Sequence, residues 1–267
     1  MSDVIVLDLD GGAMLDECLA SIHKQTVKPR RVIVLDNGSR TPVTQRVHGV
    51  EIIRSETNLG FAGGANEAYR HTTAAFVALI NNDVVLERDW LATVEAALER
   101  DEKLGAAQTI IRRPDGRIDG AGIDIGDGTY RQIGHGQAIG SPLAVAWGVS
   151  ATATLYRRAA LGSRIFDERF FAYYEDVELS ARLHENEWRV SVLPVVKATH
   201  RGSSSAHALR GDALRLRTRN RYWVARLHTG VGRINALLWE DLRLLVKGRS
   251  SVRGIVQGMF RAMSDEG

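Results

Sequence analysis

The chain has 267 residues, of which 44% are hydrophobic and 25% are charged; these values fit a soluble globular protein and exclude a disordered, collagen-like or disulfide-rich chain. At this length about 70–75% of the unfolded surface can be buried, so one large domain, or one domain with a smaller appendage, is expected. Cys18, the single cysteine, is expected to be a small core residue. Its isolation excludes internal disulfides and cysteine-based zinc sites and favours a reducing compartment.

The net charge of +3 conceals a strong asymmetry along the chain. Residues 1–200 hold 22 Lys and Arg against 27 Asp and Glu, a balance of −5, whereas residues 201–267 hold 13 against 5, a balance of +8. Such asymmetry indicates a basic C-terminal segment that faces an anionic partner, either a nucleic acid or a membrane surface. The N-terminus lacks the basic leader of a signal peptide, and no apolar stretch reaches the ~18–20 residues of a membrane span. A cytoplasmic protein, at most peripheral on the inner face of the membrane, is therefore expected.

The first 110 residues alternate short apolar runs with helical patterns, which is typical of βαβ units around a parallel sheet. Strands are predicted over 4–7, 31–35, 51–54 and 75–80, and helices over 14–24, 66–73 and 90–100. Polar clusters follow three of these strands: Asp8-Leu9-Asp10, Asp36-Asn37-Gly38-Ser39 and Asn81-Asn82-Asp83. Because open parallel sheets bind ligands beyond the carboxyl ends of their strands, the clusters are expected on one rim.

The rest of the chain has a different texture. Many glycines and short β-like pieces over 105–145 predict antiparallel hairpins and loops beside the main sheet. Further strands are predicted over 151–157 and 188–196, and further helices over 174–186, 209–227 and 234–246, of which the last two are basic.

Asn81-Asn82-Asp83 is the first candidate site, since it directly follows a run of six apolar residues. A carboxylate with neighbouring amides at a strand end offers the hard oxygen ligands that Mg²⁺ and Mn²⁺ prefer. The alternative is a capped turn, because Asn and Asp are common turn residues. His200, which ends another apolar run, either completes a carboxylate–imidazole metal site with Asp83 or is a structural residue.

Glu175, Asp176 and Glu178 lie within four positions at the predicted start of a helix, directly after an aromatic run. The helix dipole favours ionised carboxylates there, and an ionised carboxylate can take a proton from a hydroxyl group as a general base. The alternative is helix capping together with a Glu178–Arg182 ion pair one turn apart.

Residues 58–66 read Asn-Leu-Gly-Phe-Ala-Gly-Gly-Ala-Asn and predict a glycine-rich loop before a helix. Such a loop lets backbone amides approach a phosphate, but the segment matches neither a P-loop nor a dinucleotide-binding fingerprint. Close packing between a strand and a helix is the other interpretation, and it is compatible with a ligand-binding role.

Taken in order, these segments resemble the inverting family-2 glycosyltransferases of GT-A fold, in particular the rhamnosyltransferase-like bacterial branch that extends lipid-linked surface polysaccharides. The likeness covers residues 3–205. It rests on Cys18-Leu19-Ala20-Ser21-Ile22 with Gln25, Val34 to Ser39, Asn58-x-Gly60-Phe61-Ala62-x-Gly64-x-Asn66, Asn81-Asn82-Asp83-Val84, Phe166-Asp167-Glu168-x-Phe170-Phe171 running into Glu175-Asp176-Val177-Glu178-Leu179-Ser180-x-Arg182, and His200-x-Gly202-x-Ser204.

The resemblance implies an α/β, Rossmann-like GT-A fold with a mostly parallel central sheet. Its catalytic domain would span 1–205, with a nucleotide-sugar-binding half over 1–110 and an acceptor-binding half over 111–205. A basic helical extension would follow over 206–267.

The resemblance also assigns roles to residues. Asp83 would be the acid of the DXD-like motif that holds Mg²⁺ or Mn²⁺, with help from His200. Asp176 would be the general base, with Glu175 beside it. The donor-binding candidates are Asp36, which would hold the base or ribose, and Asp8, Asp10, Asn37, Asn58, Gly64, Asn66, Asn82 and Asp83. The acceptor-binding candidates are Trp147, Gly148, Tyr174 and Arg182.

The implied reaction moves a sugar, rhamnose from dTDP-rhamnose in this branch, from a dTDP- or UDP-linked donor to a hydroxyl of a polyprenyl-diphosphate-linked saccharide. The cation would neutralise the departing diphosphate, and Asp176 would take the acceptor's proton. Attack opposite the leaving group would invert the anomeric centre without a covalent intermediate.

The chain departs from the family pattern at several positions. Asp8-Leu9-Asp10 replaces the usual amide-and-aromatic sequence after the first strand, which removes an expected contact to the base. Arg40-Thr41 stands where an acid commonly follows the Asn-Gly-Ser turn, and Asn81 occupies the first position of the DXD-like motif. Arg40 could engage phosphate or solvent instead.

The basic C-terminal helices, with Trp223 and Trp239, suit the surface of an anionic bilayer. Alternatively they form a solvated helical lid packed on the catalytic domain. Four arginines of this segment could also reach the acceptor's pyrophosphate, namely Arg215, Arg217, Arg219 and Arg221.

Two other functions compete with sugar transfer. A nucleotidyltransferase shares a parallel sheet and an acidic metal site, but it should have a basic glycine-rich phosphate loop near its N-terminus, and the sequence has none. A nucleic-acid-binding protein would use the C-terminal arginines, but this function leaves the acidic rim unexplained.

Overall fold

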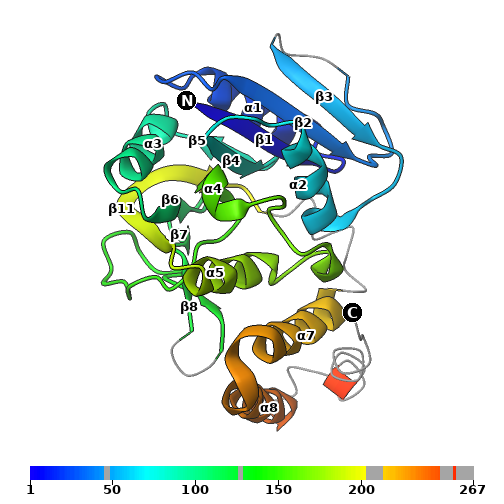
Figure 1. Cartoon of the computed structure of the whole chain (residues 1–267), viewed down its shortest axis with the longest axis vertical. Coiled ribbons are helices and arrows are strands. Elements are labelled where there is room, and N and C mark those ends of the chain that lie inside the picture. The colour runs from blue at the N-terminus through cyan, green and yellow to red at the C-terminus, as the bar shows by residue number, and fades with distance from the viewer. Residues whose placement is uncertain (45–48, 126–128, 203–212, 247–254, 257–267) are drawn as a thin grey trace.

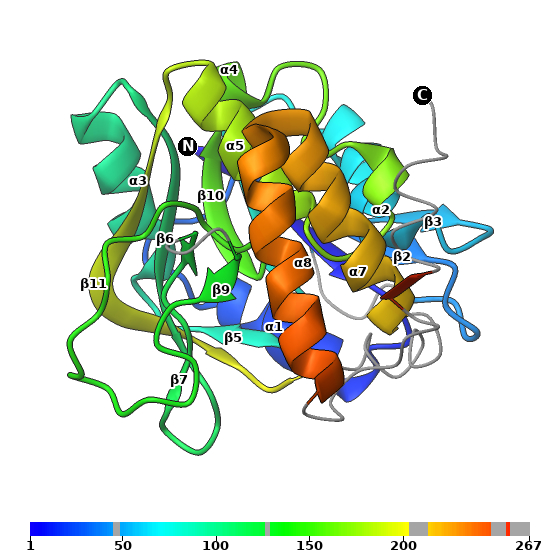
Figure 2. The same cartoon turned by 90° about the horizontal axis from the view of Figure 1, so that it is seen from below.

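One mixed, curled sheet runs through the computed structural model, which describes residues 1–44, 49–125, 129–202, 213–246 and 255–256 (Figures 1 and 2). Its strand order is β3-β2-β1-β4-β10-β6-β11-β5, with β7 paired to β6. Helices cover both faces of this sheet. A pair of C-terminal helices lies beyond the helices that cover one of these faces (Figure 1).

The N-terminal part of the sheet is parallel. It consists of β1 (Ser2–Asp8), β2 (Arg31–Asn37), β3 (Val50–Ser55) and β4 (Phe76–Asn81). β1 pairs with β2 on one side and with β4 on the other. The chain therefore adds β2 and β3 on one side of β1 and then returns to add β4 on the opposite side. The strands predicted from the four apolar runs are confirmed, and the carboxyl ends of β1, β2 and β4 lie at one edge as expected.

The C-terminal part of the sheet mixes directions. Its strands are β5 (Val84–Leu86), β6 (Leu104–Arg112), β7 (Ile118–Gly120), β10 (Ala153–Arg157) and β11 (Arg189–His200). β10 is antiparallel to both β4 and β6, whereas β6 and β11 run parallel and β11 is antiparallel to β5. β11 extends four residues beyond the predicted strand, and this extension brings His200 beside Val84.

The prediction of hairpins and loops over 105–145 is wrong at its start. Residues 104–112 form β6, which lies inside the sheet between β10 and β11 and is buried along almost its whole length. Its small residues, Gly-Ala-Ala at 105–107, lack the β-branched pattern of a strand because they face close neighbours on both sides. The short hairpin of β8 (Ile123–Asp124) and β9 (Arg131–Gln132) fits the predicted texture.

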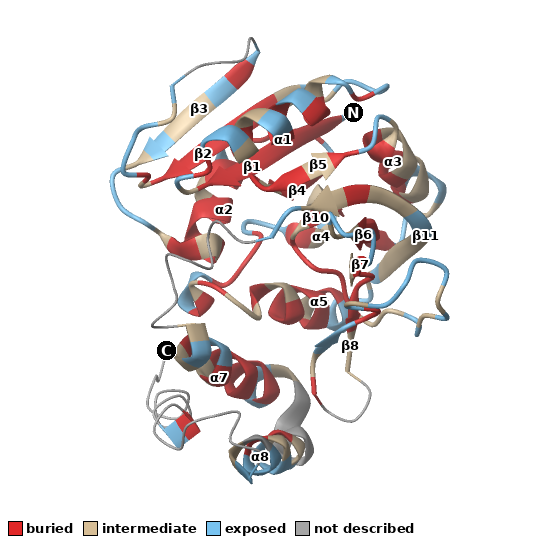
Figure 3. Cartoon of the chain, turned by 180° about the vertical axis from the view of Figure 1, so that it is seen from behind, coloured by how far each residue is buried: buried red, intermediate tan, exposed pale blue. Residues whose placement is uncertain are grey.

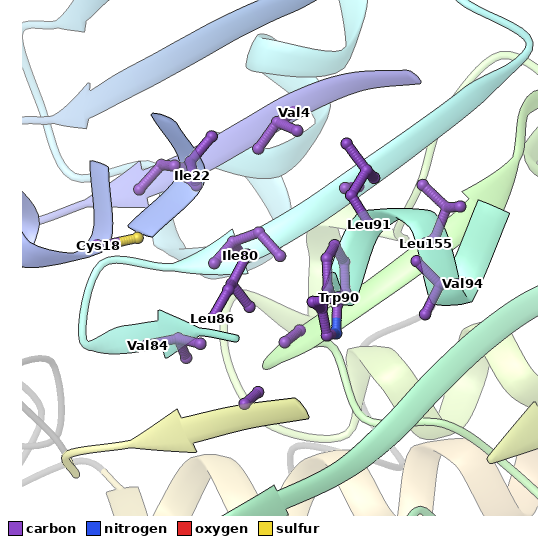
Figure 4. Packing of buried hydrophobic residues seen from close by; sticks show 14 of the residues in the cluster. Val4, Cys18, Ile22, Ile80, Val84, Leu86, Trp90, Leu91, Val94 and Leu155 are labelled. Carbon is purple, nitrogen blue, oxygen red and sulfur yellow. The ribbon is translucent and has the colours of Figure 1, made fainter. Parts of the chain in front are cut away.

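Two hydrophobic cores sandwich the sheet. On one face, α1 (Ala13–His23) and α3 (Trp90–Arg100) pack on the strands, with Cys18 and Trp90 fully buried (Figures 3 and 4). On the other face lie α2 (Gly60–Arg70), α4 (Arg158–Leu161) and α5 (Glu175–Glu185). Because successive strand residues point to opposite faces, Val4 and Val6 enter the first core and Ile5 enters the second.

The helix predicted over 66–73 begins six residues earlier, at Gly60. The glycine-rich segment is therefore the first part of α2 and not a loop, so the strand–helix packing interpretation describes it. A side chain at position 64 would lie 2.7 Å from Leu7 and 3.0 Å from Leu35. The absence of a side chain at Gly64 thus lets α2 pack closely on β1 and β2.

The C-terminal helices pack against the catalytic part of the chain. α7 (Ala213–Val224) continues through a π-helical turn (Ala225–Thr229) into α8 (Gly230–Val246). Trp223 contacts Phe170, with ring centroids 5.3 Å apart, and the Tyr222 hydroxyl donates to Asp241 at 2.6 Å. The start of the predicted helix over 209–227, and most of the extension beyond 246, lie outside the described residues.

Candidate active site

A cavity of about 300 Å³ opens at the carboxyl ends of β1, β2 and β4. Eight residues that the sequence singled out line it: Asp8, Asn37, Asn58, Asn82, Asp83, Glu175, Asp176 and His200. They come from the strand ends, from the segment before α2, from the start of α5 and from the end of β11. The fold therefore brings the predicted metal-binding, donor-binding and base residues into one cavity.

Asp83 and His200 meet at one corner of the cavity. His200 Nε2 lies 3.2 Å from Asp83 Oδ2, and His200 Nδ1 lies 2.8 Å from Asp119 Oδ2, which projects from β7. Burial by itself would lower the pKa of His200, but the two carboxylates outweigh it and raise this pKa to about 10. The imidazole of His200 therefore favours its protonated form between these two side chains.

Two oxygens at this corner have no partner. Asp83 Oδ1 and Asn81 Oδ1 are buried and accept no hydrogen bond from any described residue. Buried polar atoms in native proteins are almost always satisfied, so unpaired oxygens beside an imidazole fit a cation that completes their coordination. Across the described ranges, however, no three His, Cys, Asp or Glu side chains are close enough to hold a metal by themselves. Asp83 and His200 can supply two coordinating atoms, and the remaining coordinating atoms must come from a bound molecule.

Several of the polar residues predicted to bind the donor are linked by hydrogen bonds. Asn82 donates from Nδ2 to Asp8 Oδ1 at 2.6 Å, and Asn37 donates to Asn58 Oδ1 at 3.2 Å. Burial raises the pKa of Asp8, and the nearby charge of Asp36 adds to this effect. These contacts fix the side chains that surround the floor of the cavity.

Asp36 lies beneath the rim and does not line the cavity. Its carboxylate accepts hydrogen bonds from the backbone of Ser39 at 2.9 Å and of Val43 at 3.0 Å, and it pairs with Arg54. Burial alone would raise the pKa of Asp36, but these donors outweigh it and lower the pKa. The carboxylate thus shapes the turn after β2.

The two departures on the donor side contact each other. Arg40 donates from its backbone N and from Nε to the Asp10 carboxylate, at 3.0 and 2.9 Å. This pair borders a second hollow of about 270 Å³ between α1 and the ends of β2 and β3. Arg40, which stands where the family commonly has an acid, therefore forms an ion pair with the carboxylate of Asp10.

The carboxyl pair Glu175 and Asp176 begins α5 at the wall of the cavity. Burial raises the pKa of Asp176 to about 6, although the Val177 backbone N donates to its Oδ1 at 2.9 Å. Burial and then the charge of Asp176 raise the pKa of Glu175 well above its ordinary range. Glu175 Oε2 is buried without a hydrogen-bond partner among the described residues. Burial and the neighbouring charge thus disfavour the ionised form of Glu175, whereas Asp176 ionises with a pKa of about 6.

A strained loop presents this pair. Phe171, Tyr173 and Tyr174 all have positive φ, at 61°, 70° and 69°. Such backbone costs about 1–3 kcal/mol per non-glycine residue and persists only where neighbouring structure enforces it. On one side the Ala62 backbone N donates to Phe171 O at 3.0 Å, and a Cβ on Gly60 would lie 2.5 Å from Phe171.

α7 contributes one arginine to the cavity. Arg217 lines it, with its guanidinium 4.4 Å from the centre of the Tyr173 ring. Arg221 instead pairs with Glu240 and Asp241 of α8, and Arg219 donates to backbone carbonyls before α5. Arg217 is thus the arginine of these three that reaches the cavity.

Comparison with known proteins identifies the family. The family model described as glycosyl transferase family 2 matches residues 4–164. The chain belongs to glycosyl transferase family 2. It is also similar, at 27% identity over 235 residues covering 76% of each chain, to N-acetylglucosaminyl-diphospho-decaprenol L-rhamnosyltransferase of Mycobacterium tuberculosis.

Solved structures share the fold of this glycosyltransferase. S. aureus TarS 1–349 in complex with UDP-GlcNAc superposes with a TM-score of 0.63 at 19% identity, over 88% of this chain and 70% of that one. Mannosyltransferase PcManGT from Pyrobaculum calidifontis, in complex with GDP-Man and Mn²⁺, has a TM-score of 0.59 at 16% identity, over 100% and 88%. These are GT-A glycosyltransferases, so the predicted fold class is confirmed, and the family match confirms the predicted glycosyltransferase class.

Several candidate residues of the glycosyltransferase lie outside the main cavity. The Asn66 side chain is buried and accepts from the backbone N of Ile165 and Phe166 while donating to Phe166 O and Glu168. Gly64 packs on the sheet, as described above. Both positions organise α2 and the segment before α5, and neither lines the main cavity.

The acceptor-side candidates gather around α5. The rings of Trp147 and Tyr174 both lie near Tyr130, with centroids 6.3 and 5.7 Å away, and Gly148 packs against Ser180. Arg182 donates to Glu178 at 3.2 Å, which is the ion pair considered from the sequence. None of the four candidates, Trp147, Gly148, Tyr174 and Arg182, lines the cavity.

Two contacts around the cavity were not predicted from the sequence. Asp119 holds His200 from a glycine-rich segment that carries no motif, and its pairing depends on β7 lying beside β6. Phe171 contacts Gly60 across more than a hundred positions of sequence. Neither contact has a local signal in the sequence.

Proposed function

We propose that this glycosyltransferase transfers rhamnose from dTDP-rhamnose to a hydroxyl of a saccharide carried on polyprenyl diphosphate, with inversion at the anomeric carbon. The observation that carries the proposal is that Asp83 and His200 line the same cavity as the carboxyl pair of α5. The rhamnosyltransferase relative, whose printed name includes N-acetylglucosaminyl-diphospho-decaprenol, supports this donor and this kind of acceptor.

Asp176 is the general base in this proposal. It is ionised at neutral pH, yet its raised pKa makes it a stronger proton acceptor than an ordinary aspartate. The acceptor hydroxyl gives its proton to Asp176 as its oxygen attacks the sugar. Protonated Glu175 keeps a second negative charge away from the attacking oxygen.

Asp83 and His200 are the metal-binding residues in this proposal. The unpaired Asp83 oxygen and the adjacent imidazole fit Mg²⁺ or Mn²⁺, provided that His200 releases its proton, because only the neutral ring is a ligand. When bound, the cation neutralises the negative charge that develops on the departing diphosphate. Asp119, 2.8 Å from His200 Nδ1, would accept a hydrogen bond from that nitrogen and leave Nε2 as the ring's ligand atom.

The donor nucleotide is held by the rim of β1, β2 and β4. Asp8, Asn37, Asn58 and Asn82 line the cavity and contact the sugar nucleotide, while Asp36 orders the turn after β2 and the Asp10–Arg40 pair borders the base. Arg217 binds phosphate oxygens, of the donor or of the lipid-linked acceptor, because this residue lines the cavity and its guanidinium matches phosphate geometry.

A membrane surface is the proposed partner of α8. No helix within the described residues is both long and apolar enough to cross a bilayer. Leu238, Trp239, Leu242 and Val246, at helical spacing, are nevertheless exposed at 38%, 67%, 50% and 80%, and residues 201–267 carry a balance of +8. α8 itself is neutral, with two arginines against two acids, so its apolar stripe would insert at the bilayer interface while the basic residues elsewhere in 201–267 attract the anionic surface. Trp239→Glu should reduce sedimentation of the protein with phosphatidylglycerol vesicles, and unchanged sedimentation would contradict this contact.

A donor panel tests the proposed function. Purified protein is mixed with dTDP-rhamnose and with UDP-, GDP- and dTDP-linked hexoses, with and without Mn²⁺ or Mg²⁺, and scored by thermal shift and by nucleotide release. dTDP-rhamnose with metal should give the largest shift and the fastest release. A response to another nucleotide sugar alone would overturn the donor assignment, and no response to any would overturn the proposed function.

A further inference from the structure

We infer that Asn220 on α7 is a positioning residue for sugar transfer, because its amide fastens the backbone loop that presents Glu175 and Asp176 to the cavity. Asn220 lies about forty residues after the carboxyl pair and does not line the cavity. The inference rests on the proposal that this pair acts in the transfer step.

The loop is unable to hold its shape by itself. Positive φ at Phe171, Tyr173 and Tyr174 is unfavourable for residues with bulky side chains, and no glycine interrupts residues 165–176 to relieve it. The tight 3₁₀ turn over Glu168–Phe170 leads directly into this loop, and α5 begins at the residue after it. Any relaxation of the loop therefore displaces the first turn of α5.

Asn220 satisfies the carbonyls of this loop. It is fully buried, and its Nδ2 lies 2.8 Å from Phe170 O, 2.9 Å from Ala172 O and 2.6 Å from Tyr173 O, so that its two N–H groups serve three carbonyls, one of them through a shared hydrogen. Its Oδ1 accepts from Arg219 Nε at 2.8 Å, which fixes which end of the amide faces the loop. One side chain thus binds three carbonyls of four consecutive residues.

Arg219 and Trp223 support the same attachment. Arg219 Nη2 donates to Arg169 O at 2.7 Å and to Phe170 O at 3.2 Å, and the Trp223 ring packs on buried Phe170. The Ala62 backbone N donates to Phe171 O from the other side. These contacts together hold the loop between α2 and α7. The C-terminal helices are therefore a working part of the active site and not only a cover over it.

Only an amide fits the Asn220 site. Aspartate has the same shape, but it would aim a carboxylate oxygen at three carbonyl oxygens and offer no donor. Alanine would remove the donor of the Ala172 and Tyr173 carbonyls and leave Phe170 O with the bond from Arg219. In either variant the loop relaxes, and a shift of about 1 Å at the base lowers the rate of chemistry by roughly 100-fold.

The test compares Asn220→Asp and Asn220→Ala with Thr218→Val. Thr218 is equally buried on α7, but its hydroxyl bonds within the helix to Leu214 O at 2.9 Å, so it is a matched control that does not touch the loop. Turnover is measured with dTDP-rhamnose and polyprenyl-diphosphate N-acetylglucosamine, well below each variant's melting temperature, together with the affinity for dTDP and Mn²⁺. Asn220→Asp should lower kcat per folded molecule by roughly 100-fold and leave nucleotide affinity within a few-fold, and Thr218→Val should leave both unchanged.

The outcomes separate this inference from the proposed function. Unchanged kcat per folded molecule in both Asn220 variants, with only a lower melting temperature, would overturn the positioning role. Asp176→Asn is assayed in parallel, and if it retains turnover the base assignment itself is wrong. If the Asn220 variants do not fold, Arg219→Ala removes two of the loop contacts from a more exposed side chain. It should then lower kcat roughly tenfold, and unchanged kcat in Arg219→Ala would equally overturn the inference.

Discussion

Protonation of Asp176 should switch off sugar transfer on the acid side of neutrality. With a pKa of about 6, this carboxyl is roughly nine-tenths ionised at pH 7 and roughly one-tenth ionised at pH 5. A base must be ionised to accept a proton, so activity should fall about tenfold between these values. An aspartate at its ordinary pKa of about 3.9 would stay more than nine-tenths ionised at pH 5 and would give almost no change.

The assay is kcat/KM for the acceptor as a function of pH, because this ratio reports the enzyme before the acceptor binds. Asp176→Asn should lower it by roughly 10²- to 10⁴-fold, the range of general-base catalysis. Glu175→Gln should keep both the activity, within a few-fold, and the acid limb near pH 6. Glutamine imitates the protonated form that burial and Asp176 impose on Glu175.

Three results would refute this reasoning. An acid limb near pH 4 would show that Asp176 is not desolvated in the functional enzyme. Full activity in Asp176→Asn would remove it from the mechanism. Loss of activity in Glu175→Gln, with activity retained in Asp176→Asn, would exchange the roles of the two residues. Circular dichroism at pH 5 controls for unfolding.

Three further variants test the surroundings of the cavity. Asp119→Asn should weaken Mn²⁺ binding in the presence of dTDP by about 10- to 100-fold, since it removes the partner that orients His200; calorimetric titration with unchanged affinity would contradict this. Asn66→Ala breaks three buried hydrogen bonds and a half-buried one to Glu168 and should destabilise the fold by about 2–4 kcal/mol in urea unfolding, and an unchanged midpoint would show that the amide is dispensable. Gly60→Ala places a Cβ 2.5 Å from Phe171 at a φ of 74° and should lower kcat more than it lowers donor affinity; equal losses in both would instead indicate a local disruption of α2.

The sheet was predictable where the sequence patterns are strong. Apolar runs such as 75–80, bounded by polar clusters, predicted the parallel strands and the rim where their ends meet, and the structure has both. β6 was missed because it starts with Gly-Ala-Ala. These small residues have low β-propensity, but they fit the close packing between β10 and β11. The first turns of α2 were missed because glycine disfavours helices locally, whereas Gly64 is needed where α2 approaches the sheet.

The candidate site was predictable to the extent that its residues follow strand ends or open helices. Those rules selected Asp83 and Asp176, which the fold brings to one cavity. They could not show that the Asp36 carboxylate is bound by its own turn, nor that Asn66 faces away from the cavity, because these contacts depend on tertiary structure. Asp119 and Asn220 belong to the same class, since each acts on a segment that lies far from it in sequence.

The loop held between α2 and α7 constrains how this enzyme can be recombined with its relatives. A chimera joined near residue 205 would keep every residue that lines the cavity before that point, but it would receive a foreign partner for the carbonyls of residues 170–173. Such an exchange would be expected to fold and still transfer sugar poorly. Segments 168–176 and 213–224 therefore depend on each other, although they lie far apart in the chain. A chimera that exchanges the C-terminal helices should take both segments from the same parent protein.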